Sequence, residues 1–113
     1  MKRKITELEQ KLIDDGWYLN VKRYTGKHSE KIETYEYHKT SDLRHNGNSY
    51  DQIIKLDQKR SQIVNYGINN LVIEWLDNDE LMQIRFLFLE LRHYVERLTK
   101  EEETNEVVEN ADL

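Results

Sequence analysis

The chain has 113 residues, no cysteine and no proline, and a net charge of −5 at pH 7. The lack of cysteine excludes disulfide bonds and thiolate metal ligands, and the length fits one domain. Residues 1–60 carry 13 Lys and Arg against 10 Asp and Glu, whereas residues 100–113 carry one Lys against six acidic residues. We therefore expect one neutral domain over residues 1–99, followed by a disordered acidic tail over residues 100–113.

The first third of the chain predicts a helix and then a hairpin of two strands. Apolar residues recur at helical spacing over residues 2–15, and Gly16 is a typical helix stop. Residues 17–24 alternate between the two sides of an extended chain, which is typical of a half-buried strand. After a polar loop, residues 30–38 are rich in Tyr, Thr and Ile, so we expect a second strand paired with the first.

The middle of the chain is harder to assign. Residues 40–48 are polar and include a glycine, which predicts a mobile connection. Residues 50–56 could form a third strand or join the helix that follows, and Asp57 as a helix N-cap favours the strand. The helix predicted from Asp57 to Leu76 has an apolar face that contains Gly67, which would allow close approach to the sheet. That face consists of Val64, Ile68, Leu71, Val72, Trp75 and Leu76.

A last helix is predicted over residues 78–99, with Asp77 and Glu80 as its capping box. One stripe of apolar residues follows the 3-4-3-4-3 spacing of a single helix face: Leu81, Ile84, Phe88, Leu91, Val95 and Leu98. A second, shorter stripe points in roughly the opposite direction and consists of Met82, Phe86 and Leu89. A small domain normally buries one face per helix, so the second stripe calls for a partner.

In sum, the pattern predicts an α+β fold with a short N-terminal helix, a three-stranded antiparallel sheet, two C-terminal helices and the acidic tail. No apolar run approaches the roughly 18 residues that a membrane-spanning helix needs, and the N-terminus does not resemble a signal peptide. We therefore expect a cytoplasmic protein of a bacterial cell that is not membrane-bound.

Catalytic and metal-binding residues are not evident. The serines lack the context of an activated nucleophile, and the acidic pairs sit where helix capping explains them. His38, Asp42 and His45 lie close together in the sequence, but their spacing matches no zinc motif. We therefore expect no enzyme activity, no metal and no cofactor.

Two surfaces are candidates for binding. The partner-binding candidate combines the second stripe with an acidic cluster at the helix junction: Met82, Phe86, Leu89, Glu74, Asp77, Asp79 and Glu80. The alternatives are that this stripe packs on the chain's own sheet or first helix, or that two copies pair through their last helices. Tyrosines interleaved with basic residues in the hairpin form a candidate surface for single-stranded nucleic acid: Tyr18, Lys22, Tyr24, Tyr35 and Tyr37.

Over residues 4–80 the chain resembles the type II anti-CRISPR proteins, small phage proteins of Gram-positive hosts that inhibit an RNA-guided nuclease stoichiometrically. Three short segments carry the resemblance: Asp15-Gly16-Trp17-Tyr18-Leu19, Gly47-Asn48-Ser49-Tyr50 and Glu74-Trp75-Leu76. Some of these inhibitors are strongly acidic, whereas this body is neutral and its last helix is longer and more apolar. The resemblance implies a protein-interaction module, an inhibitor of a host defence nuclease.

Overall fold

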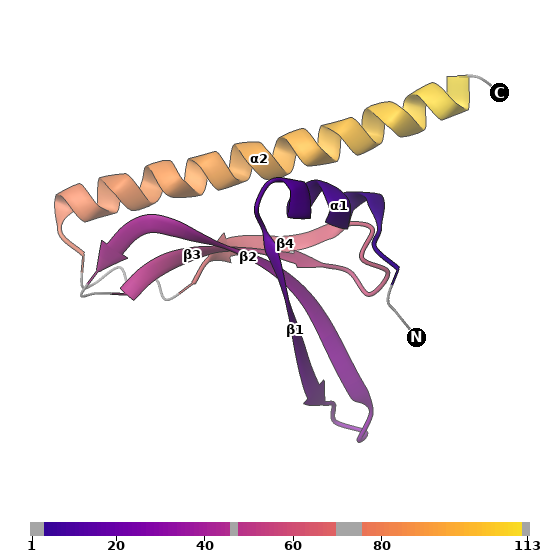
Figure 1. Cartoon of the computed structure of the whole chain (residues 1–113), viewed down its shortest axis with the longest axis horizontal. Coiled ribbons are helices and arrows are strands. Elements are labelled where there is room, and N and C mark those ends of the chain that lie inside the picture. The colour runs from indigo at the N-terminus through magenta and orange to yellow at the C-terminus, as the bar shows by residue number, and fades with distance from the viewer. Residues whose placement is uncertain (1–3, 46–47, 70–75, 112–113) are drawn as a thin grey trace.

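The structure is a computed structural model that describes residues 4–45, 48–69 and 76–111 (Figure 1). For residues 45, 48 and 101–111 it describes the backbone alone. Six elements follow one another along the chain: α1 (Glu7–Asp14), β1 (Tyr18–Thr25), β2 (Lys31–His45), β3 (Asn48–Leu56), β4 (Ile63–Ile68) and α2 (Asn78–Ala111). The predicted α+β class is confirmed, but the described residues contain four strands instead of three, and one C-terminal helix where two were predicted.

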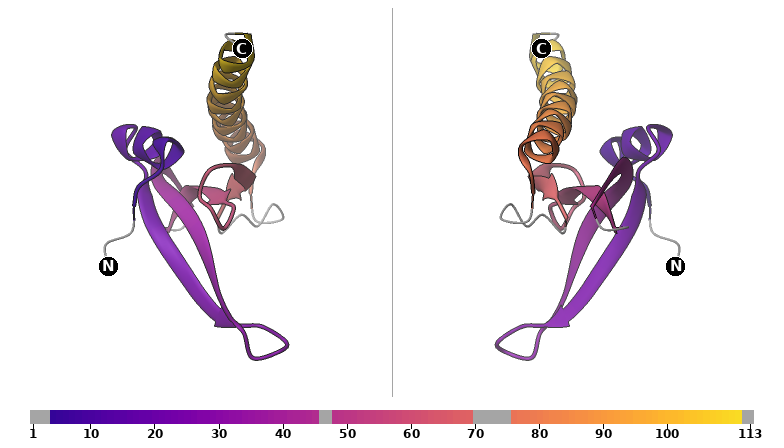
Figure 2. Two further views of the ribbon diagram at one scale, coloured as in Figure 1. Left: turned by 90° about the vertical axis from the view of Figure 1, so that its right-hand side faces the viewer. Right: turned by 90° about the vertical axis from the view of Figure 1, so that its left-hand side faces the viewer.

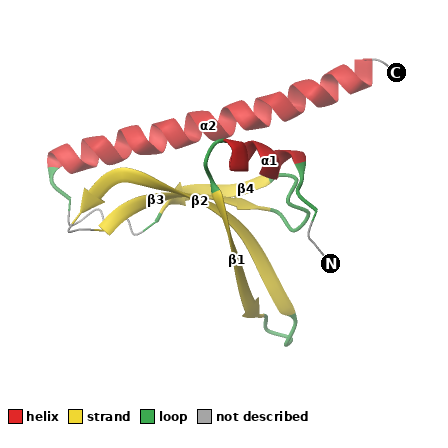
Figure 3. Ribbon diagram, viewed as in Figure 1, coloured by secondary structure: helices red, strands yellow, loops and turns green. Residues whose placement is uncertain are grey.

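The four strands form an antiparallel sheet in the order β1-β2-β3-β4, so every strand pairs with its neighbour in the sequence. Both helices lie on the same side of this sheet, with α2 running across it and α1 beside α2 (Figures 2 and 3). The sheet is strongly twisted, and the end of the β1–β2 hairpin projects away from the helices as a two-stranded arm (Figure 1). One side of the sheet therefore carries the core, and no helix covers the other.

The core forms where alternate residues of the strands face the helices. The register aligns Val21 with Tyr35 and Leu56, and Leu19 with Tyr37 and Ile54, so these residues share one side. Ten buried side chains form the cluster: Leu8, Leu12, Trp17, Tyr35, Tyr37, Ile54, Leu56, Leu91, Val95 and Leu98. Both helices and the three strands β1–β3 thus border one hydrophobic core, to which Ile63 and Tyr66 of β4 add partly buried side chains.

The helix predicted from Asp57 is wrong over residues 57–69, because a turn and β4 occupy this segment. Asp57 Oδ1 accepts hydrogen bonds from the backbone N–H of Ser61 (2.8 Å) and of Gln62 (3.3 Å). The backbone N–H of Asp57 donates to the carbonyl of Gln62, and Arg60 takes a left-handed conformation with φ of 58°. The side chain that can cap a helix therefore closes a hairpin turn here.

Part of the predicted helical face lies outside the described residues, namely Leu71, Val72 and Trp75, as does Glu74. Gly67 belongs to β4, and a Cβ built on it has no heavy atom within 4 Å. The expected close approach between Gly67 and the sheet is therefore wrong, because Gly67 is itself part of the sheet and faces open space.

The mobile connection predicted for residues 40–48 is also wrong where the structure describes it. β2 continues to His45, and after a bulge between Thr40 and Arg44 its residues pair with the start of β3. Ser41 is buried, and its hydroxyl donates to the carbonyl of Tyr50 across the two strands. Thr40, Asp42 and Arg44 are exposed, and a strand with such exposed positions needs few apolar residues.

The predicted start of the last helix is confirmed. Asp77 Oδ1 accepts the backbone N–H of Glu80 at 2.8 Å, as an N-cap does. The helical backbone continues to Ala111, beyond the predicted end at residue 99, so no break in the helix marks the expected domain boundary. Among the residues that the structure describes, no helix is long and apolar enough to span a membrane.

Candidate partner-binding site on helix α2

The two faces of α2 differ as the sequence predicts. The first stripe faces the sheet, with Ile84, Leu91, Val95 and Leu98 at most 7% exposed. Leu81 is half-buried, and the Phe88 ring lies at the edge of the stripe against Tyr66 of β4, with ring centroids 5.8 Å apart. The expected core face is thus confirmed, and the side chains of the second stripe must lie elsewhere.

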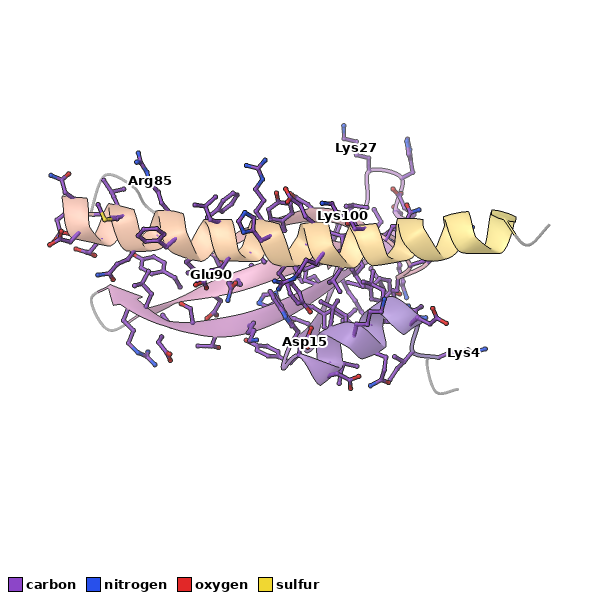
Figure 4. The ribbon with its side chains drawn as sticks, turned by 90° about the horizontal axis from the view of Figure 1, so that it is seen from above. Lys4, Asp15, Lys27, Arg85, Glu90 and Lys100 are labelled. Atoms are coloured by element: carbon purple, nitrogen blue, oxygen red, sulfur yellow. The ribbon has the colours of Figure 1, made fainter. Side chains whose placement is uncertain are left out.

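The second stripe is open to solvent. Met82 is 58% exposed, Phe86 is 60% exposed and Leu89 is 43% exposed. The alternative that these residues pack on the chain's own sheet or first helix is therefore wrong. Arg85 and Glu90 project from opposite flanks of α2 (Figure 4). We call Met82, Phe86 and Leu89 the outer patch.

A groove of about 310 Å³ lies beside the outer patch, between α2 and the end of β2. Phe86 and Leu87 on α2 and Leu43 on β2 make its lining partly apolar, and Asp42 and Glu90 add two carboxylates. The groove therefore combines apolar side chains, the exposed Phe86 ring among them, with two carboxylates. Its complete lining is Ser41, Asp42, Leu43, Gln83, Phe86, Leu87 and Glu90.

Sequence reasoning missed Asp42 and Leu43 as neighbours of Phe86. They are more than 40 positions away and were assigned to a loop, but they lie in the bulge of β2, between the paired residues Thr40 and Arg44. A β-bulge gives no clear sequence signal, so only the extended β2 strand shows this side of the groove.

Three residues of the predicted acidic cluster, Asp77, Asp79 and Glu80, have roles within α2 and its contacts, apart from any partner. Asp77 caps α2, and burial of the phenol, together with the charge of Glu80, raises the pKa of Tyr50 on β3. Asp79 is exposed in the first turn of α2, where an acid also stabilises the helix dipole. The carboxylates beside the outer patch are instead those of Asp42 and Glu90.

Arg85 projects from a flank of α2 beside the outer patch (Figure 4), and two further charged residues, Arg92 and Glu96, follow Leu89 by about one and two turns. They form an ion pair one turn apart, with 3.1 Å between Nε and Oε1 and both side chains about half exposed. A surface ion pair of this kind contributes little to the stability of the fold.

Pairing of two copies through the first stripe is not possible in this fold. Leu91, Val95 and Leu98 belong to the chain's own core cluster, together with Leu8 and Leu12 of α1. A homodimer that pairs its last helices would therefore have to use the outer patch.

The five residues of the predicted nucleic-acid surface do not share one side of the sheet. Tyr35 and Tyr37 are 8% and 1% exposed and lie in the core, so this part of the prediction is wrong. The register explains the division, because Tyr18, Lys22 and Tyr24 alternate with the core residues of β1 and lie on the side without helices.

Comparison with known proteins adds no assignment to these surfaces, because no family model matches the chain and neither a curated protein nor a solved structure matches it. The functional argument therefore rests on the geometry of the described residues.

Proposed function

We propose that the chain is a non-catalytic protein-interaction module whose partner packs on the outer patch of α2. One observation carries this proposal: Met82, Phe86 and Leu89 form a continuous apolar face that the chain's own fold leaves exposed. Exposed apolar side chains are ordinary when scattered, but a row on one helix face beside a groove is typical of a docking surface.

The chemistry of the groove defines the partner. Asp42 and Glu90 favour basic side chains, and Phe86, Leu87 and Leu43 favour an apolar side chain inserted between them. A protein surface that presents an apolar anchor beside Lys or Arg fits both requirements. Enzymes that bind nucleic acids carry basic surfaces of this kind.

Together with the resemblance to type II anti-CRISPR proteins, this chemistry leads us to propose an RNA-guided nuclease of the bacterial host as the partner. The chain would be a phage inhibitor that acts in the bacterial cytoplasm by occupying a surface of the nuclease. Burial of the three patch side chains would contribute about 1.5–3 kcal/mol each before the cost of association. The Phe86 ring is the expected hot spot.

The test compares Phe86→Asp with Val64→Asp, which adds the same charge at a side chain of equal exposure on β4 (59%). Binding to the purified nuclease with its guide RNA is measured by titration, after circular dichroism has shown that both variants are folded. Wild type and Val64→Asp should bind one to one, and Phe86→Asp should bind at least about tenfold more weakly.

Equal binding by Phe86→Asp and wild type would remove the outer patch from the mechanism. If the nuclease binds neither protein, the choice of partner is wrong, and light scattering then tests the homodimer. A dimer that Phe86→Asp converts to monomer would replace the inhibitor by a self-associating module. A wild-type monomer at high concentration would exclude that alternative.

A further inference from the structure

The side of the sheet without helices carries a second candidate surface. On β1 the row Tyr18, Asn20, Lys22 and Tyr24 faces this side, and Lys55 of β3 lies across from it. Tyr18 is 50% exposed and Tyr24 is 53% exposed. Six residues of extended strand separate the two rings by roughly 20 Å.

Tyr18 is held in place. Its ring lies against the His38 imidazole on β2, with ring centroids 5.8 Å apart and planes inclined by 37°. His38 is itself buried and contacts the buried carboxylate of Glu36, with 3.1 Å between Nε2 and Oε1. The Tyr18 ring is therefore already ordered in the free protein, so a ligand that stacks on it causes little further loss of side-chain entropy.

This side of the sheet carries two lysines, Lys22 and Lys55, and two carboxylates, Glu36 and Asp51. Glu36 is 7% exposed, and the ammonium group of Lys22 lies 3.4 Å from it, above the sheet. A hollow of about 250 Å³ opens beside this pair, with Lys55, Asn65 and Gly67 in its lining. Two lysines and two asparagines, Asn65 and Asn69, thus line a space in which the one lining carboxylate is buried.

The projecting arm extends this positive surface. Lys27 lies in the turn of the hairpin and points away from the body (Figure 4), and the Glu30 carboxylate of the same turn accepts the backbone N–H of His28. Lys31 pairs with Thr25 and lies on the other side of the strands, where Arg23 is bound to Glu33 at 2.9 Å. Within the described parts of the chain Lys27 forms no ion pair, so phosphate groups that follow β1 toward the arm would meet this cation.

We infer that this surface binds single-stranded nucleic acid, with bases stacked on Tyr18 and Tyr24 and phosphates near Lys22, Lys55 and Lys27. Aromatic platforms combined with a basic track are the physical requirements for binding a single strand. A duplex fits less well, because its bases are already stacked on one another and cannot rest on the two rings. The inference is independent of the outer patch, which lies on the opposite side of the molecule.

The test is fluorescence anisotropy of a labelled oligothymidylate of about 15 nucleotides at low salt, with the full chain. Tyr18→Leu and Tyr24→Leu should each weaken binding about tenfold, because leucine keeps the apolar volume and lacks the aromatic face. Tyr18→Phe and Tyr24→Phe should bind as wild type. This pattern distinguishes stacking from a general loss of structure.

Electrostatic contact is tested separately by the salt dependence. Lys22→Ala should lower the slope of log affinity against log salt by about 0.7, the value for one phosphate of a single strand. Lys59→Ala removes the same charge from the exposed turn between β3 and β4 and should leave affinity and slope unchanged. A duplex of the same length should bind at least tenfold more weakly than the single strand.

Three results would overturn the inference: no anisotropy change at low salt, leucine variants that bind as tightly as wild type, or a duplex that binds as well as the single strand. The last result would point to phosphate attraction alone. Failure here leaves the proposed protein-binding role of Phe86 untouched, because Phe86→Asp does not alter this side of the sheet.

Discussion

The hydroxyl of Tyr94 on α2 donates a hydrogen bond to the carboxylate of Asp15, 79 positions earlier, with 2.6 Å between the oxygens. The Tyr94 ring also stacks on Trp17, with ring centroids 5.6 Å apart and an interplanar angle of 14°. Lys39 lies 6.0 Å from the Trp17 ring, and Arg97 lies 5.9 Å from the Tyr94 ring. This arrangement joins the turn between α1 and β1 to the middle of α2.

The Tyr94 contact predicts a dependence of stability on alkaline pH. Burial and the bond to Asp15 raise the pKa of the Tyr94 hydroxyl well above its ordinary value of 10.0. The folded state therefore holds this proton more tightly than the unfolded chain, so the contribution to stability is complete below pH 10 and is lost as pH rises above it. Tyr94→Phe should cost about 1 kcal/mol at pH 7, and this difference should shrink above pH 10.

Urea unfolding at pH 7, 9 and 11 measures this effect. The phenylalanine keeps the ring that stacks on Trp17, so the variant isolates the hydroxyl. A difference between wild type and Tyr94→Phe that stays constant up to pH 11 would contradict the assignment.

The buried carboxylate of Glu9 predicts a large effect at a distant residue. Glu9 is 1% exposed and accepts hydrogen bonds from Tyr37 Oη (2.7 Å) and from Arg60 Nη1 (2.9 Å). Arg60→Ala would leave the carboxylate buried without its cation, at an expected cost of about 3–5 kcal/mol. The double variant Arg60→Ala with Glu9→Gln should recover part of this loss, because the amide carries no charge.

A double-mutant cycle by chemical unfolding measures the coupling between these two residues. Additive losses at Glu9 and Arg60 would show that the pair is not coupled in the folded protein.

Two leucines on α2 provide a direct test of which way the helix faces. Leu91 is 1% exposed in the core, whereas Leu89 is 43% exposed in the outer patch. Leu91→Ala should lower the unfolding free energy by about 2–5 kcal/mol, and Leu89→Ala should change it by less than about 0.5 kcal/mol. Comparable losses at the two positions, measured by thermal unfolding of the monomer, would mean that both sides of α2 are covered.

Substitution of two glycines should change the stability of the protein in opposite directions. Gly67 lies in β4 with open space around its missing side chain, so Gly67→Val should stabilise the protein by about 0.5–1 kcal/mol. Gly16 has φ of 92°, so Gly16→Ala should destabilise it by about 1–2 kcal/mol. Melting temperatures of the two variants on opposite sides of wild type are the expected result, and a destabilised Gly67→Val would show that this position is constrained.

The spacing of apolar residues predicted the secondary structure correctly where it fits only one kind of element. The 3-4-3-4-3 stripe of α2 and the alternation of residues 17–24 each fit a single kind of element, and the structure contains both. The second stripe was predicted as a face opposite the first, but the alternative that it packs on the chain's own sheet or first helix stayed open, and the exposure of Met82, Phe86 and Leu89 in the structure excludes it.

The patterns failed where local chemistry fits two structures. Val64 and Ile68 are four residues apart, which fits a helix face, but both belong to the short strand β4. Asp57 can cap a helix or a turn, and the left-handed conformation of Arg60, which lets it reach Glu9, decides for the turn. Contacts between residues about 50 positions apart made this choice, and local spacing does not contain them.

The stack on Trp17 has a practical consequence. Indole emission responds strongly to neighbouring aromatic and charged groups, and Trp17 lies between the Tyr94 ring and the Lys39 ammonium. Any event that lifts the long helix from the sheet must separate Trp17 from Tyr94. The chain has a second tryptophan, Trp75, so in a Trp75→Phe variant Trp17 becomes an intrinsic optical reporter of the contact between α2 and the sheet, which needs no added label while a ligand is titrated.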